Sequence, residues 1–303
     1  MSSQRSHSTD APVAYLDNAA TTMPLPEVVE TVSAVMAEGL GNASARHSRG
    51  VRAKKLMNEC RATVADALGV EPDEVYFTSG GTEANNLALA LLSGDAHAVT
   101  DAIEHESVLA CATSRDATIV GVDGTGMVRA EDVRAALRPD TELVSVSLAN
   151  GEIGTVQPIR AIARVVAQER MRRLEEGGQT PLLLHTDASQ AAGAVSVNAS
   201  TLGVDLLTLS AAKIYGPKQV GLLWHADGVA LRPLVLGGGQ EGGLRSGTQN
   251  VAGAVGFAAA LEIAERMRPA EVSRLRHLSS LMQGELAQEL PDAVFSGPRQ
   301  AKL

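Results

Sequence analysis

The chain has 303 residues, of which 45% are hydrophobic and 20% charged, a composition that supports one or two folded domains and excludes a disordered protein. Its 26 Lys and Arg residues against 35 Asp and Glu give a formal net charge of −9, which indicates no nucleic-acid partner. With one Trp, three Tyr and three Phe, the chain is also poor in the aromatic side chains on which bases stack.

The cysteine count and the apolar stretches bound the protein's environment. Cys60 and Cys111 are too few for a disulfide framework or a Cys-rich metal site, and they suit a reducing cytoplasm. The longest apolar stretch, residues 251–261, is too short to span a bilayer. Residues 1–12 lack the apolar centre of a signal peptide. We therefore expect a cytoplasmic protein with no membrane partner, and we predict no metal site.

The hydrophobic pattern predicts alternating helices and strands. An amphipathic helix is expected at residues 26–40, where Val28, Val32 and Val35 share one face. Strands are expected at residues 74–78, 98–102, 118–122, 142–148, 182–186, 206–209 and 221–224. Further helices are expected at residues 82–92, from His105 onward, at 131–137, at 159–173 and throughout the region after 249. This alternation predicts an α/β fold, with a mostly parallel sheet covered by helices on both faces.

The domain organisation follows from the same pattern. Residues 1–14 are predicted to form a flexible tail, and residues 15–262 a large domain. Residues 263–303 are expected to begin a smaller C-terminal domain. Because the chain stops soon after the turn at residues 296–298, we expect this second domain to be cut short.

In a parallel sheet, ligands bind beyond the carboxyl ends of the strands, so the residues that follow each strand are site candidates. After the first strand, the turn at residues 79–83 opens directly into a helix. The free N–H groups and the dipole of that helix would bind a phosphate, with Gly81 allowing close approach and Thr82 adding a hydroxyl. A glycine turn with a helix cap explains these residues about equally well.

Three other polar residues follow predicted strands. His105 begins a helix and by itself is better explained as a capping or core histidine. Asp187 is a carboxylate that is costly to desolvate without a partner, although a helix cap is slightly favoured for it alone. Lys213 has apolar neighbours, which favour the neutral amine that Schiff-base chemistry requires. Most lysines are solvated loop residues, and Lys218 fits that description better.

Taken together, these residues point to one cofactor. Pyridoxal phosphate requires an amine for its aldehyde, an acid beside its pyridine nitrogen, a flat side chain against its ring and a cradle for its phosphate. Lys213, Asp187, His105 and the 79–83 turn would supply these four features.

Eight motifs in this sequence extend the pattern. They are YLDNAATT at 15–22, TSGGTE at 78–83, EH at 104–105, NGEIG at 150–154, DASQ at 187–190, KIYGPK at 213–218, GGGQE at 237–241 and RSGT at 245–248. In content and order they resemble the cysteine desulfurases, which belong to the class V aminotransferase family and to fold type I of the pyridoxal phosphate enzymes. The resemblance runs from Tyr15 to the last residue.

The resemblance implies a role for each site residue. Lys213 would carry pyridoxal phosphate and move protons, His105 would stack on the ring, and Asp187 would pair with the pyridine nitrogen. Gln190 would contact the ring hydroxyl. The phosphate would be held by Gly81, Thr82 and Ser210. Thr248 would reach the phosphate of the partner subunit, because family members are homodimers with shared active sites.

The resemblance also implies the reaction and the partners. The substrate would be L-cysteine or a similar amino acid, whose sulfur passes to an enzyme cysteine and leaves alanine. A sulfur-acceptor protein would be a further partner, in sulfur metabolism and iron–sulfur cluster assembly.

Departures from the family pattern limit how far these family roles apply to this sequence. Ala212 stands where the family usually has a histidine, Gly151 replaces the second of two adjacent asparagines, and Gly242 replaces an arginine. Each change predicts weaker cofactor binding, by about 1 kcal/mol for a lost hydrogen bond. The nucleophilic cysteine and the arginine that binds the substrate carboxylate would lie beyond residue 303. Cys60 and Cys111 precede Lys213 in the chain and do not match that cysteine, so we expect little persulfide transfer.

Alternatives remain open at this point. Residues 237–242 satisfy the dinucleotide pattern G-x-G-x-x-G, but the predicted helix begins several residues later, which disfavours that use. Another class V enzyme, an aminotransferase or a selenocysteine lyase, would use the same cofactor residues. A remnant or dimerising subunit that binds the cofactor without turnover is the third reading, motivated by the departures and by the end of the chain.

Overall fold

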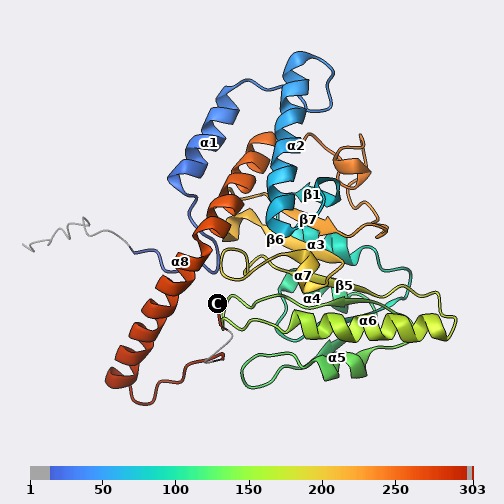
Figure 1. Ribbon diagram of the computed structural model, residues 1–303, viewed down its shortest axis with the longest axis vertical. Helices are drawn as coiled ribbons and strands as arrows, with labels where there is room; N and C mark the ends of the chain where they lie inside the picture. The colour runs from blue at the N-terminus through green and yellow to red at the C-terminus, as the bar shows by residue number, and fades with distance from the viewer. Residues whose placement is uncertain (1–13, 299–301) are drawn as a thin grey trace, which may run out of the picture.

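The fold is built on a seven-stranded sheet, which a computed structural model describes within residues 14–298 and 302–303 (Figure 1). The strands are β1 (Val75–Thr78), β2 (His97–Asp101), β3 (Ala117–Val120), β4 (Thr141–Ser145), β5 (Leu183–Asp187), β6 (Leu206–Ser210) and β7 (Gly221–His225). The α-helices are α1 (Pro26–Ala37), α2 (Ser48–Leu68), α3 (Gly81–Leu89), α4 (Glu106–Thr113), α5 (Ala130–Ala136), α6 (Ile159–Glu175), α7 (Ala199–Leu202) and α8 (Val251–Glu289). Short 3-10 helices are η1 (Pro72–Glu74), η2 (Ala211–Lys213) and η3 (Glu241–Gly243).

The sheet has the order β1-β7-β6-β5-β4-β2-β3 and is mostly parallel, as predicted. The pairs formed by β2 to β6 are parallel, and β7 runs antiparallel to both β1 and β6. Each predicted strand is present, with ends that differ from the prediction by no more than three residues. The predicted helix at 26–40 ends earlier, at Ala37, and Gly39 then adopts a left-handed conformation with φ of 67°.

Alternating strand residues pack into two separate apolar clusters. Leu207 and Leu222 belong to a large cluster with residues of α2, α6 and α8. Their chain neighbours Leu206 and Leu223 belong to a second cluster with residues of α3 and α4. Because consecutive side chains of a strand point to opposite faces, the two clusters lie on opposite sides of the sheet. This confirms the prediction of helices on both faces.

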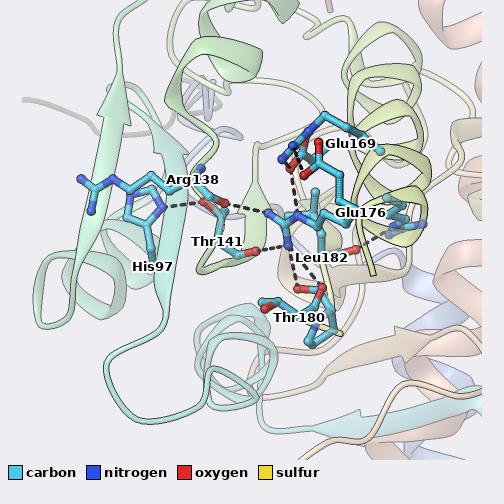
Figure 2. A network of polar contacts seen from close by, with 11 residues as sticks. His97, Arg138, Thr141, Glu169, Glu176, Thr180 and Leu182 are labelled. Atoms are coloured by element: carbon cyan, nitrogen blue, oxygen red, sulfur yellow. Dashed lines mark hydrogen bonds and ion pairs between the residues drawn. The ribbon is translucent and has the colours of Figure 1, made fainter. Parts of the chain in front are cut away.

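A buried arginine binds the backbone at the amino end of β4, which is the end of the sheet opposite the candidate site. The guanidinium of Arg173, on α6, donates to the backbone oxygens of Arg138 and Thr141, at 2.8 Å each, and its Nε donates to Glu169 at 2.9 Å (Figure 2). The side chain of Thr141 in turn contacts His97 Nδ1 at 2.8 Å. The fork of the guanidinium thus satisfies carbonyl groups at the start of β4 that α6 covers.

Helix α8 begins inside the body of the molecule and ends outside it. Its buried residues all lie between Val251 and Leu261. The remainder extends away from the sheet (Figure 1) and exposes large apolar side chains that include Leu275, Leu278 and Met282. The helix changes from buried to exposed near the border that the sequence predicts between the two domains. The helix is continuous across residues 262 and 263, and the division remains a prediction. Of the predicted N-terminal tail, only Ala14 falls within the described residues. Within the described part of the chain, no helix combines the length and the apolar character needed to cross a bilayer.

Candidate active site

A cavity of about 810 Å³ opens at the carboxyl ends of the parallel strands. Seven of the eight predicted site residues line it: Gly81, Thr82, His105, Asp187, Gln190, Ser210 and Lys213. They come from segments that are far apart in the sequence, and the sheet order brings β2, β4, β5 and β6 side by side. The eighth, Thr248, is exposed and lines a separate cavity of about 230 Å³ with Arg245 and Gln249.

The turn before α3 has the backbone of an anion cradle. Gly80 has φ of 150°, a conformation that L residues rarely adopt, and α3 begins at the next residue. The N–H groups of its first turn have no partner within the helix. A Cβ added to Gly81 would lie 3.2 Å from Ser189 Oγ, so a larger residue would crowd the cavity wall. Gly221 has a similar purpose in β7, because a Cβ there would lie 2.5 Å from the carbonyl carbon of Gly80.

The amine of Lys213 lies at the cavity wall, held by the chain's own backbone. Its Nζ donates to the carbonyl oxygens of Ala19 at 2.8 Å and Ala20 at 2.7 Å. Burial lowers the pKa of the Lys213 amine, while the charges of Asp187 and Asp17 act in the opposite direction. The amine therefore loses its proton more readily than a solvated lysine, which favours its use as a nucleophile.

The carboxylate of Asp187 is buried and oriented by two donors. Oδ1 accepts from the backbone N–H of Ser189 at 2.9 Å, and Oδ2 accepts from Asn85 Nδ2 at 2.7 Å. His105 caps α4, where its Nδ1 accepts from the backbone N–H of Ser107 at 3.1 Å. Its side chain is exposed to the cavity. The cap that the sequence favoured for His105 alone is thus present, and it leaves the ring on the cavity wall.

Asp101, Glu104 and His185 are buried titratable residues, and Glu104 lines the cavity. Burial raises the pKa of Asp101 to about 6, and it lowers the pKa of His185 to about 4. Burial, followed by the charges of Asp101 and Asp187, raises the pKa of Glu104 well above its usual range. His185 contacts Ser145 Oγ at 2.8 Å and Thr208 Oγ1 at 3.1 Å, as expected for a neutral buried imidazole.

These shifts predict opposing pH effects on stability. Between about pH 4 and pH 6, folded Asp101 keeps a proton that the unfolded chain releases, so its contribution to stability is lost as the pH rises. Over about pH 4 to 6.5, folded His185 is neutral while the unfolded histidine is protonated, so its contribution grows as the pH rises. The Asp101→Asn variant should therefore gain more stability between pH 4.5 and 6.5 than the wild type does, by about 2 kcal/mol.

Urea unfolding at the two pH values measures this difference. Asp132→Asn, which changes an exposed carboxylate on α5, is the matched control and should follow the wild type. Equal changes in the free energy of unfolding for Asp101→Asn and the wild type would show that burial does not perturb Asp101.

Two of the three departures from the family pattern have a structural reason. A Cβ on Gly151 would lie 2.5 Å from Cδ of Gln190, so the Gln190 side chain occupies the space that a larger residue would need. Gln190 donates there to the carbonyl of Ala19 at 2.9 Å. Gly242 has φ of 63°, a conformation in which an arginine would be strained. Ala212 contributes its carbonyl oxygen, which accepts from the N–H of Thr22 at 2.8 Å, and nothing in the structure explains the loss of a histidine there.

The polar residues of the cavity wall that sequence reasoning missed include Asn85, Ser107 and Ser189. Ser189 lies within the DASQ motif, and its position two residues after Asp187 was the available signal. Asn85 and Ser107 follow a strand by several residues and sit inside helices, where a polar residue usually faces solvent. Only the packing of α3 and α4 turns them toward the site.

The cavity has the features that pyridoxal phosphate requires. It contains an amine, an oriented carboxylate, an exposed imidazole and a helix N-terminus on one wall. The buried hydroxyls of Ser147 and Ser189 line it and have no hydrogen-bond partner among residues 14–298 and 302–303. Ser189 Oγ lies on the Gly81 side, so a phosphate there would satisfy a hydroxyl that otherwise stays unpaired. The residues present therefore fit the cofactor.

The sheet and this cavity define the class of protein, a fold type I pyridoxal phosphate enzyme. A sequence profile of the family described as Aminotransferase class-V matches residues 14–302, so the chain belongs to that family, whose members depend on pyridoxal phosphate.

Known relatives place the chain near the cysteine desulfurases within this family. It is 38% identical over 299 residues to cysteine desulfurase IscS of Dictyoglomus turgidum, covering 95% of this chain and 73% of the relative. It is 41% identical over 267 residues to cysteine desulfurase IscS of Methanosarcina thermophila, covering 85% and 63%. Among solved structures, a NifS-like protein superposes with a TM-score of 0.87 at 35% identity, covering 94% of this chain and 78% of the other. SspA in complex with cysteine superposes with a TM-score of 0.76 at 34% identity, covering 82% and 72%.

Proposed function

We propose that the protein is a pyridoxal phosphate-dependent enzyme that removes the sulfur of L-cysteine and leaves alanine. The observation that carries the proposal is that Lys213 and Asp187 line one cavity together with the N-terminus of α3. The cysteine desulfurase names of the relatives, and the cysteine bound by SspA, support the choice of substrate.

Each residue has a task that its surroundings support. When bound, pyridoxal phosphate withdraws electrons from an amino acid joined to it, which weakens the bonds around the amino acid's α-carbon. Lys213, with its lowered pKa, would hold the cofactor and move a proton. Asp187 would hold a proton on the pyridine nitrogen, and His105 would offer its flat side chain to the ring. The α3 N-terminus with Gly81, Thr82 and Ser210 would bind the phosphate, and Gln190 would bind the ring hydroxyl.

The chain's own cysteines are poor sulfur acceptors. Cys60 is buried in α2, and burial raises its pKa to about 12. Cys111 is half-buried, its Sγ donates to Asn86 Oδ1 at 3.1 Å, and burial raises its pKa as well. Neither residue lines the cavity. Since the thiolate is the reactive form, sulfur release should depend on a thiol from elsewhere.

The assembly belongs to the same proposal. Thr248 lies on an exposed loop outside the active-site cavity of its own chain, as a residue that reaches a partner's phosphate would. We therefore propose a homodimer with shared active sites, a sulfur-acceptor protein as partner, and a cytoplasmic role in iron–sulfur cluster assembly.

The test is to load the chain with pyridoxal phosphate and follow its visible absorbance on addition of L-cysteine. L-Serine, which has the same shape without the sulfur, is the matched control ligand. We expect a rapid spectral change with L-cysteine, and alanine and sulfide that accumulate appreciably only when dithiothreitol is present. A loaded chain whose spectrum does not change on addition of L-cysteine would contradict L-cysteine as the substrate. Robust alanine formation with L-cysteine below the protein concentration and no other thiol would contradict the statement that Cys60 and Cys111 are poor sulfur acceptors.

A further inference from the structure

One buried amide connects the two groups that flank the cofactor position. Asn85, on α3, is fully buried. Its Nδ2 donates to Asp187 Oδ2 at 2.7 Å and to Ser107 Oγ at 2.8 Å. Ser107 Oγ in turn lies 2.7 Å from His105 Nδ1. A continuous chain of hydrogen bonds therefore runs from the carboxylate to the imidazole.

The direction of each hydrogen bond follows from its neighbours. Both hydrogens of the Asn85 amide are used, because a carboxylate accepts one and Ser107 Oγ accepts the other. The Ser107 hydroxyl therefore donates its own hydrogen to His105 Nδ1. That nitrogen also accepts from the backbone N–H of Ser107, so it carries a lone pair. Neutral His105 then has its proton on Nε2.

The burial of Asn85 argues against a purely structural role. Its Oδ1 is buried and finds no hydrogen-bond partner in the described part of the chain. An unpaired buried carbonyl oxygen is unfavourable, so an apolar residue of the same size would serve packing better. The side chain is instead held by its two N–H bonds alone, and both lead to residues of the cavity wall.

We propose that Asn85 and Ser107 are positioning residues of this active site, which together orient the Asp187 carboxylate and hold His105 as the Nε2–H tautomer. This inference rests on the proposed function for its meaning, since these are the groups that would act on the cofactor ring. The arrangement itself belongs to the chain without cofactor and is measurable there.

The first test is a long-range ¹H–¹⁵N correlation spectrum of the histidine rings in the cofactor-free chain at neutral pH, with His105 assigned by His105→Gln. We expect mainly the Nε2–H tautomer in the wild type and a measurably larger share of the Nδ1–H tautomer in Asn85→Ala and Ser107→Ala, in which only the backbone N–H of Ser107 is certain to remain a donor to Nδ1. Ser107→Thr, which keeps the hydroxyl, should restore the wild-type spectrum.

The second test is the affinity for pyridoxal phosphate, measured by absorbance titration. Asn85→Ala removes a hydrogen bond to a charged group and should weaken binding about 10- to 100-fold. Ser107→Ala leaves the bond to Asp187 intact and should have a smaller effect. Asn86→Ala is the matched control: the same residue type at the next position, bonded instead to the carbonyl oxygen of Thr82, should match the wild type in both measurements.

An Asn85→Ala chain with the wild-type tautomer and affinity would overturn the proposal, whatever its melting temperature. If Asn85→Ala does not fold by circular dichroism, Ser107→Ala against Ser107→Thr decides the His105 part. A wild-type chain that binds no pyridoxal phosphate would refute the proposed function. The tautomer comparison would still decide whether Asn85 and Ser107 position His105.

Discussion

Lys213→Ala should abolish covalent attachment of pyridoxal phosphate. In the wild type, borohydride reduction after loading should fix the cofactor to the peptide that contains residue 213. The amine that makes this bond lies at the cavity wall with a lowered pKa, whereas alanine offers no nucleophile. Mass spectrometry of the reduced, digested protein measures the loss, which should be complete.

The matched control is Lys218→Ala, five residues further along the same loop and exposed to solvent. It should be labelled as the wild type is. Equal labelling of Lys213→Ala and the wild type would mean that pyridoxal phosphate reacts with surface amines, and the assignment of Lys213 would fail.

Arg61→Met should be the most destabilising of the variants considered. The guanidinium of Arg61, on α2, forms a two-pronged pair with Glu241, at 2.6 and 2.7 Å. The Glu241 side chain is only 2% exposed, and it also accepts from the N–H of Phe77 at 2.9 Å. Without Arg61 the carboxylate is buried without a charge partner, which costs about 3–5 kcal/mol. Urea unfolding measures the loss.

Two further variants separate the ion pair from simple packing. Arg52→Met breaks another Arg–Glu pair on the same helix, but that pair is exposed, at 45% and 38%, and its loss should cost less than about 1 kcal/mol. Adding Glu241→Gln to Arg61→Met removes the stranded charge and should recover part of the stability. If the double variant is no more stable than Arg61→Met, the buried charge is not the cause. The pair also anchors η3, which begins the loop that carries Thr248.

The strands and the candidate cofactor residues were predictable from local properties of the sequence. The period-2 and period-3.6 patterns predict the sheet and its covering helices because these elements bury their apolar residues in those periods. Asp187 is the last residue of β5, and Lys213 and Gly80 lie within three residues of the ends of β6 and β1. The carboxyl ends of parallel strands meet at one end of the sheet. Their meeting in one cavity is therefore predictable without coordinates.

Contacts between distant segments were not predictable in this way. The bond from Asn85 to Asp187 joins residues 102 positions apart, and the pair of Arg61 with Glu241 joins residues 180 apart. Gln190 fills the space beside Gly151. From the sequence alone, glycine in place of the family's asparagine at this position predicts only a lost contact to the cofactor. Residue type and spacing along the chain settled which groups stand at the strand ends. The packing of α3, α4 and the 241–250 loop alone decided which of these groups touch and how burial shifts their pKa values. The reason is that hydrogen bonds and desolvation depend on distances in space.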